Sequence, residues 1–309
     1  MESEISFNEN IKNIVIDPEI SGPLKISVIT VCATVSSKLD LDYLFKTLRN
    51  FDINLPENIL NDTYFLDIAE EYRNPFHNLS IDYNPTNKKN SKVEIITSTK
   101  TKVSKTKVKT SFYNCLKMSF TFQETNNISC KIFPNGLLHI TGSKTIEVAH
   151  AIPQLLYQFI NNNQPAIKEP ELFQLKDQRI VMINTNFALK VSSKESLMSL
   201  KLNQELFKNI LNTNYSISNG GCIRLATFYP EQYPGINIKF WTKKALLQYK
   251  EHLATSKKIP KNKIDGQISI FIFKSGKISI TAAKNSADLE EAYKGIIEII
   301  RKHPEIFIT

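Results

Sequence analysis

The residues that could do chemistry in this chain of 309 residues are scattered singly. None of the four cysteines forms a CxxC pair, and no two of the five histidines lie three or four residues apart. A disulfide scaffold, a thiolate zinc site and a helical two-histidine metal motif are therefore not predicted. The chain also lacks the phosphate-binding loop GxxxxGK[ST], the GxSxG elbow and HExxH. We predict a protein with no catalytic residues, no metal and no cofactor.

Positive charge is concentrated in two segments. Residues 88–109 contain eight Lys and one Glu, and residues 243–263 contain seven Lys and one Glu. The whole chain has a formal charge of +9, so the remainder is slightly acidic. Lysine suits point-charge contact with phosphates better than the reading of guanine edges. These segments indicate contact with a polyanion, and the alternative is that they only solvate surface loops.

Two segments from the two halves of the chain repeat each other. Residues 131–144 read KIFPNGLLHITGSK and residues 271–284 read FIFKSGKISITAAK, with six identical positions in fourteen. Chance predicts about one identity, so we interpret the pair as a duplicated unit. Each copy has an apolar run ending in Ile-Phe, a turn with Gly136 or Gly276, and a second run ending in Ile-Thr. This order predicts a β-hairpin in each copy.

A helical pattern of apolar residues follows each hairpin, at residues 148–160 and 289–300. Asn285, three residues before Asp288, predicts the start of the second helix. Pro153 means that the first helix either kinks or begins near this residue.

The same order of elements recurs upstream of both hairpins. An extended run at residues 24–35 precedes a helical pattern at 41–48, and a run at 179–189 precedes a pattern at 197–210. Each half is therefore predicted to contain a strand, a helix, several strands and a final helix. The predicted fold class is α+β, with two pseudo-symmetric repeats of antiparallel sheet that leave one sheet face available to a partner.

These repeats resemble the TATA-box-binding protein family. The segments IFKSGK at 272–277 and ITAAK at 280–284 are similar to the second repeat of that family, and PEQYPG at 230–235 is similar to its PELFPG loop. The first repeat resembles the family through KLDL at 38–41 and TGSK at 141–144. The resemblance implies a saddle-shaped antiparallel sheet with helices on its convex face.

The resemblance also implies a division of the chain into three parts. We expect an acidic N-terminal tail at residues 1–22, a first repeat at 23–166 and a second repeat at 167–309. Insertions interrupt the first repeat near 51–80 and 86–110, and the second repeat near 243–266.

Members of this family bind A·T-rich promoter DNA in the minor groove and bend it with pairs of aromatic wedges. The positions that resemble these wedges are Phe133 with Phe112 or Tyr113, and Phe273 with Tyr233. An aromatic ring can replace a lost base stack without needing a hydrogen-bond partner. The tyrosine keeps the stacking plane but adds a hydroxyl that needs a partner once buried.

Further positions resemble residues that contact the groove and the DNA backbone. Thr141 and Thr281 match threonines that meet base edges. The positions that resemble phosphate-flanking basic residues are Lys144, Lys239, Lys277 and Lys284. Leu137 stands where the first repeat of the family usually has Lys.

The central asparagines of the family are not matched clearly. Residues 24–35 contain no Asn. In the second repeat Asn184 and Asn186 lie close to the expected position, which Val181 or Arg179 could equally occupy. Losing such hydrogen-bonding residues relaxes sequence preference and leaves shape-driven, electrostatic binding intact.

Glu231 matches the acidic residue through which the family meets a transcription factor IIB-like protein, so that protein and the RNA polymerase machinery are the implied partners. Two alternatives stay open. The chain could be a protein-interaction scaffold that has lost specific DNA binding. It could also be a nucleic-acid enzyme, because related folds occur in some glycosylases and ribonucleases, although no catalytic motif supports this.

The sequence predicts an intracellular protein that does not span a membrane. No run of 18 uncharged apolar residues is present. The first 22 residues contain five acidic residues, whereas a secretory signal needs a basic start and an apolar stretch. The 29 Asn, with many Lys and Ile, are typical of an A·T-rich genome, and divergent relatives of the family occur in large DNA viruses. We expect a location in the nucleus or at a cytoplasmic viral replication site.

Overall fold

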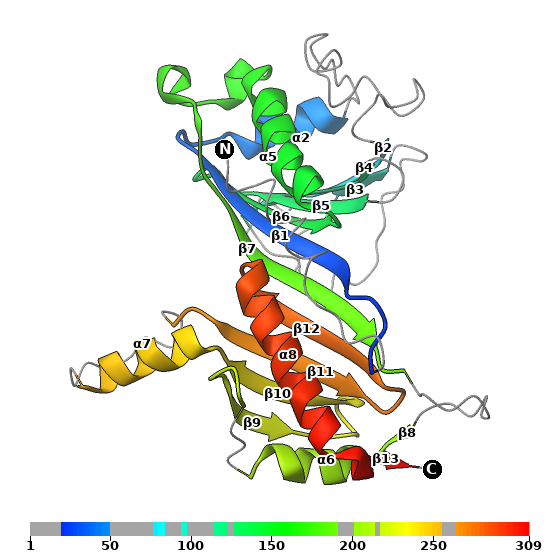
Figure 1. Cartoon of the computed structure of the whole chain (residues 1–309). Helices are drawn as coiled ribbons and strands as arrows, with labels where there is room; N and C mark the ends of the chain where they lie inside the picture. The colour runs from blue at the N-terminus through cyan, green and yellow to red at the C-terminus, as the bar shows by residue number, and fades with distance from the viewer. Residues whose placement is uncertain are drawn as a thin grey trace. The chain divides into compact units, whose positions relative to one another are not determined.

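The computed structural model describes residues 20–49, 77–83, 94–97, 114–122, 126–190, 201–213, 217–254 and 264–308. The chain forms two compact units, called here the first unit (residues 28–180) and the second unit (residues 1–27 with 181–309). Each unit consists of antiparallel strands with helices packed on one face (Figure 1). The predicted fold class of two similar α+β repeats with antiparallel sheet is therefore confirmed.

In the first unit the strands lie in the order β3-β2-β4-β5-β6-β1. The predicted hairpin of residues 131–144 is confirmed, since β5 and β6 pair antiparallel. The elements of this part of the chain are β1 (Lys25–Val35), α2 (Leu41–Arg49), β2 (His77–Tyr83), β3 (Glu94–Thr97), β4 (Leu116–Phe122), β5 (Asn126–Ile132), β6 (Leu137–Ser143) and α5 (Ile146–Asn161).

The second unit has the strand order β9-β10-β11-β12-β7 and a small sheet of β8 with β13. The second predicted hairpin is also confirmed, by the antiparallel pair of β11 with β12. The elements are β7 (Leu175–Ala188), β8 (Lys201–Leu202), α6 (Gln204–Leu211), β9 (Cys222–Thr227), β10 (Gly235–Trp241), α7 (Lys243–Ala254), β11 (Gln267–Phe273), β12 (Lys277–Ala283), α8 (Ser286–Lys302) and β13 (Phe307–Ile308).

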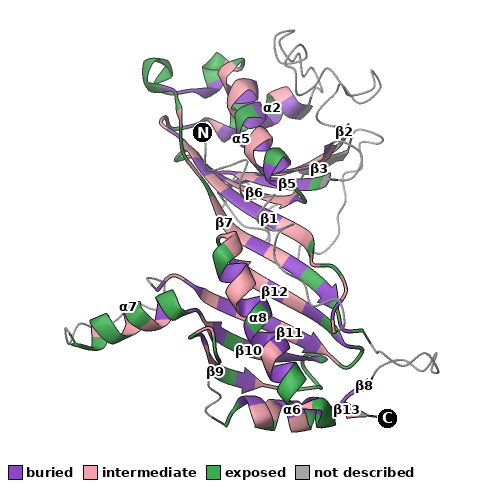
Figure 2. Ribbon diagram, viewed as in Figure 1, coloured by how far each residue is buried: buried purple, intermediate pink, exposed green. Residues whose placement is uncertain are grey.

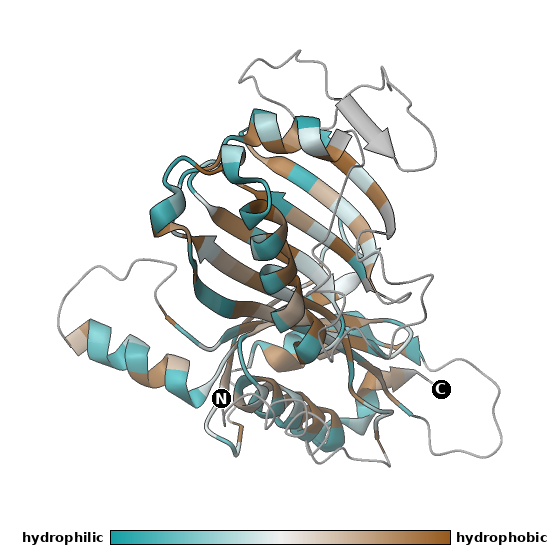
Figure 3. Ribbon diagram, turned by 90° about the horizontal axis from the view of Figure 1, so that it is seen from above, coloured by the Kyte–Doolittle hydropathy of each residue, from teal (hydrophilic) through white to brown (hydrophobic). Residues whose placement is uncertain are grey.

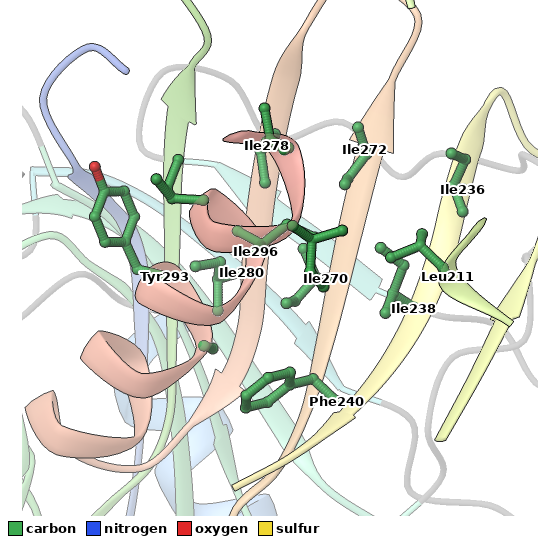
Figure 4. Packing of buried hydrophobic residues seen from close by; sticks show 14 of the residues in the cluster. Leu211, Ile236, Ile238, Phe240, Ile270, Ile272, Ile278, Ile280, Tyr293 and Ile296 are labelled. Carbon is green, nitrogen blue, oxygen red and sulfur yellow. The ribbon is translucent and has the colours of Figure 1, made fainter. Parts of the chain in front are cut away.

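Alternation along the strands builds the core. In β11 the residues Ile268, Ile270 and Ile272 are buried, whereas the residues between them stay partly exposed. Successive side chains of a strand point to opposite faces, so the three isoleucines lie on one side of the sheet. There they pack in one cluster with residues of α8 such as Ile296 (Figure 4). A similar banding of buried and more exposed residues runs along β4 and β12 (Figures 2 and 3).

Side-chain caps set the starts of the helices. The side chain of Asn285 accepts a hydrogen bond from the amide of Asp288 at 2.8 Å, which confirms the predicted start of α8. Thr145 caps α5, and this helix continues through Pro153. Of the two alternatives for Pro153, a kink or a helix start near it, the second is excluded, because the threonine cap places the start at Ile146. None of the helices in the described ranges is both long and apolar enough to cross a bilayer.

The segment at residues 20–26 is packed into the second unit. The hydroxyls of Ser21 and Tyr293 lie 2.5 Å apart in a buried hydrogen bond, and the amide of Gly22 donates to the carbonyl of Ala188 at 2.8 Å. The side chains of Ile20, Leu24 and Ile26 pack against the core of the same unit. The last three residues of the expected acidic tail, 20–22, are therefore held against the end of β7 and α8.

Candidate nucleic-acid interface

Each unit has a sheet face that carries partly exposed side chains opposite its helices, called here the open face. In the second unit the core side of β11 and β12 is formed by isoleucines, and the alternate positions form the open face. Strand pairing joins these positions in rows across the sheet, because opposite residues of an antiparallel pair share a face. One row contains Lys239, Ser269 and Thr281, and the next contains Asn237, Phe271 and Ser279.

Three aromatic rings on this side of the second unit form the aromatic cluster, Tyr233, Phe271 and Phe273. The ring centroid of Tyr233 lies 5.5 Å from that of Phe271 and 5.8 Å from that of Phe273, in edge and tilted arrangements. Tyr233 remains 44% exposed. The two predicted wedge residues of the second repeat are thus together, and Phe271 is a third ring that the sequence interpretation missed. The alternation of β11 was the available signal for it.

Gly235 makes room for two of these rings. It lies directly opposite Phe273 in the pairing of β10 with β11. A Cβ atom at this glycine would lie 3.0 Å from the Tyr233 ring and 3.1 Å from the Phe273 ring. The glycine of the PEQYPG segment therefore allows both rings to lie across bare backbone.

Phe133 occupies the same turn position in the first unit that Phe273 occupies in the second. The amide of Gly136 donates to the Phe133 carbonyl at 2.9 Å, and the amide of Gly276 donates to the Phe273 carbonyl at 2.9 Å. Both phenylalanines are partly buried. The expected partner of Phe133, Phe112 or Tyr113, lies outside the described residues, so only one ring of the first predicted wedge pair is placed.

The two predicted groove threonines have equivalent surroundings. The hydroxyl of Thr141 donates to the Ser129 carbonyl at 3.4 Å, and that of Thr281 donates to the Ser269 carbonyl at 3.3 Å. Each acceptor lies on the neighbouring strand of the same hairpin, at the same spacing from its threonine. Internal repetition thus extends from sequence to hydrogen bonding.

The predicted phosphate-flanking lysines differ in their surroundings. Lys277 and Lys144 are exposed, and Lys239 Nζ donates to the hydroxyl of Ser269 at 2.8 Å. Lys284 Nζ instead donates to Oδ1 of Asp265 at 2.5 Å. This hydrogen bond is the main cause that lowers the pKa of Asp265 below its ordinary value, so the carboxylate stays charged at neutral pH.

Asp265 belongs to the segment near 243–266 that was expected to be an insertion, and it also lies 3.9 Å from Lys244 of α7. In the second unit this segment therefore supplies lysines such as Lys244 and also an acid, Asp265, that pairs with the predicted DNA-contacting residue Lys284. The pair joins Asp265, two residues before β11, to Lys284, the residue after β12, and no sequence signal indicated it.

A bulge lies at the position where one repeat has Gly and the other has Ala. Gly142 and Ala282 lie at equivalent positions, with φ of 113° and 70°, and the pairing of β6 with β1 and of β12 with β7 shifts register beside them. A Cβ atom at Gly142 would lie 2.0 Å from the Asn127 carbonyl oxygen, so only glycine fits there. Ala282 fits its site but adopts a left-handed backbone that disfavours a side chain.

Of the candidates for the central amide position, Asn184 has its Oδ1 3.4 Å from the Ala282 amide, which donates to it. Asn186 is exposed and lies opposite Ser279 on the open face of the second unit. Arg179 is exposed and Val181 is partly buried.

In the loop at 230–235, residues 230–234 are exposed. Glu231 and Tyr229 are exposed, and the amide of Tyr233 donates to the Tyr229 carbonyl at 2.9 Å, which closes the turn. The side-chain amide of Gln204 in α6 donates to the Pro234 carbonyl at 2.8 Å. The turn and this anchor fix the position of Tyr233 relative to the sheet.

The far end of β10 carries a second aromatic group that the sequence did not indicate. The guanidinium of Arg224 lies 4.6 Å from the ring centroid of Trp241 and 5.4 Å from that of Tyr249. The Trp241 and Tyr249 rings meet edge to face at 5.0 Å and connect β10 to α7.

Within the part of the chain that the structure describes, no group of three or more His, Cys, Asp or Glu could hold a metal ion.

Three comparisons with known proteins find similarity to TATA-box-binding proteins. Residues 215–303 match the profile of transcription factor TFIID (or TATA-binding protein, TBP). A curated protein of Acanthamoeba polyphaga mimivirus described as TATA-box-binding protein-like is 23% identical over 295 residues, which cover 91% of this chain. The match spans 65% of the length of that relative. Among solved structures, the TBP of Methanococcus jannaschii matches with a TM-score of 0.43 and 14% identity, covering 90% of this chain and 98% of that one.

Proposed function

We propose, from the premise that this chain is a divergent TATA-box-binding-protein-like protein with a viral relative, that it binds duplex DNA and bends it at promoters to start transcription. The open faces of the two units are the proposed DNA-binding surfaces. No catalytic role is part of the proposal.

The aromatic cluster is the observation that carries this proposal. Tyr233, Phe271 and Phe273 lie on the side of the sheet opposite α8, and the apolar core of the second unit does not include them. Aromatic side chains left outside a core favour a partner that supplies apolar surface. Base steps opened from the minor groove supply such surface, and the kink then brings more protein against the DNA.

The polar residues beside the cluster suit the same ligand. Thr281, Ser269 and Asn237 offer small hydrogen-bonding groups, which can meet the acceptors that A·T pairs present in the minor groove. Lys239 and Lys277 are exposed at the same open face and suit contact with phosphates. We propose A·T-rich duplex DNA as the ligand, with relaxed sequence preference.

The test compares binding and bending in single-ring variants. End-labelled duplexes, one A·T-rich and one G·C-rich, report affinity by fluorescence anisotropy and bending by energy transfer. Phe273→Ala, Phe271→Ala and Phe133→Ala are each expected to reduce bending. The matched control is Tyr43→Ala, because Tyr43 is an exposed aromatic residue on helix α2.

Bending that survives in all three phenylalanine variants would reject the wedge mechanism. Binding without bending in the native chain, with equal affinity for the two duplexes, would reduce the function to nonspecific contact by lysines.

A protein-interaction scaffold is the second candidate. Helix α7 favours it, because Leu247 and Leu253 are 52% and 58% exposed on a helix that buries only Ala245. Complete absence of DNA binding in the test above would favour the scaffold. For the DNA-binding protein, the proposed partners are a transcription factor IIB-like protein that meets Glu231 and the RNA polymerase machinery. The proposed location is the nucleus or a cytoplasmic viral replication site.

A further inference from the structure

A row of three basic side chains crosses the open face of the first unit. Strand pairing places Lys117 of β4 opposite Lys131 of β5, and Lys131 opposite His139 of β6. Residues paired in this way have Cβ atoms about 5 Å apart on the same side of the sheet. We call Lys117, Lys131 and His139 the basic row.

The row lies on the side of the sheet opposite the helices. The next residues along the three strands, Met118, Cys130 and Ile140, are fully buried, so they point into the core. Lys117 is exposed, and Lys131 and His139 are partly exposed. A ligand placed on this open face would contact the row.

The two residues that flank the basic row on the neighbouring strands, β2 and β1, include one carboxylate. Asp82 of β2 lies opposite Lys117, and Cys32 of β1 lies opposite His139. Burial raises the pKa of the Cys32 thiol, which therefore stays neutral at pH 7. Across these five paired strands, one carboxylate thus shares a row with two lysines and a histidine.

Like charges at opposite positions of a strand pair repel each other, and Lys117 and Lys131 are such a pair. The charge of Lys131 also acts on His139, whose imidazole has its pKa lowered first by burial and second by this charge. A bound anion would reverse this repulsion. This arrangement favours a polyanionic ligand on the open face.

The second unit presents different chemistry at the equivalent register positions of its described strands. Asn237, Phe271 and Ser279 occupy them, and all three are uncharged. The open face is therefore aromatic at this place in the second unit and cationic in the first. The sequence repeat shows the central substitution directly, because Lys131 and Phe271 are the first residues of the two repeated segments.

We propose that the basic row is a binding site for the phosphodiester backbone of duplex DNA, so that the open face of the first unit contacts phosphates at the place where that of the second unit presents Phe271. This proposal rests on the proposed function, because it assigns the same ligand to a second and chemically different set of residues. Lysine and histidine side chains are attracted by the negative potential of DNA, whatever the base sequence.

The test measures the salt dependence of DNA affinity for the full chain. Wild type, Lys117→Gln, Lys131→Gln and the double variant bind a labelled A·T-rich duplex in a series from about 50 to about 200 mM salt. Removal of each phosphate contact is expected to lower the slope of log affinity against log salt by about 0.9, which is about a 3.5-fold smaller loss of affinity across that range. Lys46→Gln is the control, since Lys46 is exposed on helix α2 of the same unit.

Slopes of the row variants that equal that of Lys46→Gln would overturn the inference. If the native chain binds and bends DNA under these conditions, that result leaves the proposed function intact, whereas no binding by the native chain rejects the proposed function itself. Poly-glutamate serves as a second probe. Row variants that lose poly-glutamate binding but keep the native DNA slope would assign the row to an acidic protein and overturn the DNA site.

Discussion

Lys284 donates a hydrogen bond of 2.5 Å to Asp265, so a lysine predicted to flank DNA phosphates is already paired within the second unit. Both side chains are about half exposed, and a pair of this kind contributes at most about 1 kcal/mol to stability. DNA phosphates can therefore compete with Asp265 for the lysine at little cost.

Asp265→Asn is expected to raise DNA affinity, because it leaves Lys284 and Lys244 without their shared carboxylate. The slope of log affinity against log salt should steepen by up to about 0.9 for each further phosphate that the two lysines bind. Glu290→Gln is the control, since it removes one acidic charge that pairs with Lys294 on helix α8. If both variants raise affinity equally, the effect is one of net charge, and Lys284 is not a DNA contact.

Ala282→Gly is expected to stabilise the second unit by about 0.5–1 kcal/mol. A left-handed backbone costs an alanine about 1–2 kcal/mol, and the greater chain entropy of glycine offsets part of the gain. Calorimetric melting of the full chain gives the measurement. Ala283→Gly is the control, because this neighbour is fully buried and should lower the melting temperature. An unchanged or lower melting temperature for Ala282→Gly would contradict the argument from φ.

Ser21→Ala is expected to destabilise the second unit by about 1 kcal/mol through loss of its buried hydrogen bond to Tyr293. A double-mutant cycle with Tyr293→Phe separates this bond from other effects of either change. The two changes together should cost less than their sum. Strictly additive costs would mean that the bond contributes nothing.

DNA affinity is expected to rise as the pH falls, and His139 is the proposed cause. Its pKa is lowered from 6.5 in the free protein by burial and by Lys131, and a phosphate beside the row would raise the pKa again. The bound state then takes up a proton. The increase in affinity is complete below the pKa of the free protein and is lost as the pH rises through the pKa of the complex.

Anisotropy titrations between about pH 5.5 and pH 8 test this linkage. The groups that face His139 across the strands are Lys131 and the neutral thiol of Cys32. His139→Gln should flatten the dependence, while His150→Gln on helix α5 should retain it. A pH dependence that survives in His139→Gln would assign the proton to another group.

Much of the fold follows from local sequence. The hairpins, the cap at Asn285 and the repeat of helix after hairpin are set by alternation, turn residues and side chains within a few positions. The placing of Phe133 and Phe273 at one turn position follows from the same local pattern. Pro153 left the start of α5 undecided between two alternatives, and the side-chain cap at Thr145 decides it, with buried apolar residues on both sides of the proline.

The parts of the site that escaped prediction depend on contacts across the sheet. The Lys117–Lys131 pairing requires the register of β4 with β5. The alternation of β11 could place Phe271 on the open face, but its contact with Tyr233 requires the loop that carries Tyr233 to fold back over β11. Neither the strand pairing nor the ring contact can be derived from spacing along the chain. The packing of residues 20–26 on the second unit has the same origin, since its partners are up to 272 residues away.

That last feature sets an order for folding during synthesis. The ribosome makes Ser21 before the first unit and Tyr293 after it, yet both belong to the second unit, where their hydroxyls share a buried hydrogen bond. Residues 20–26 cannot form their native contacts until the entire first unit has been synthesised, because contacts between residues so far apart in the chain form late and slowly. The apolar residues Ile20, Leu24 and Ile26 therefore gain their native packing only when translation has reached α8.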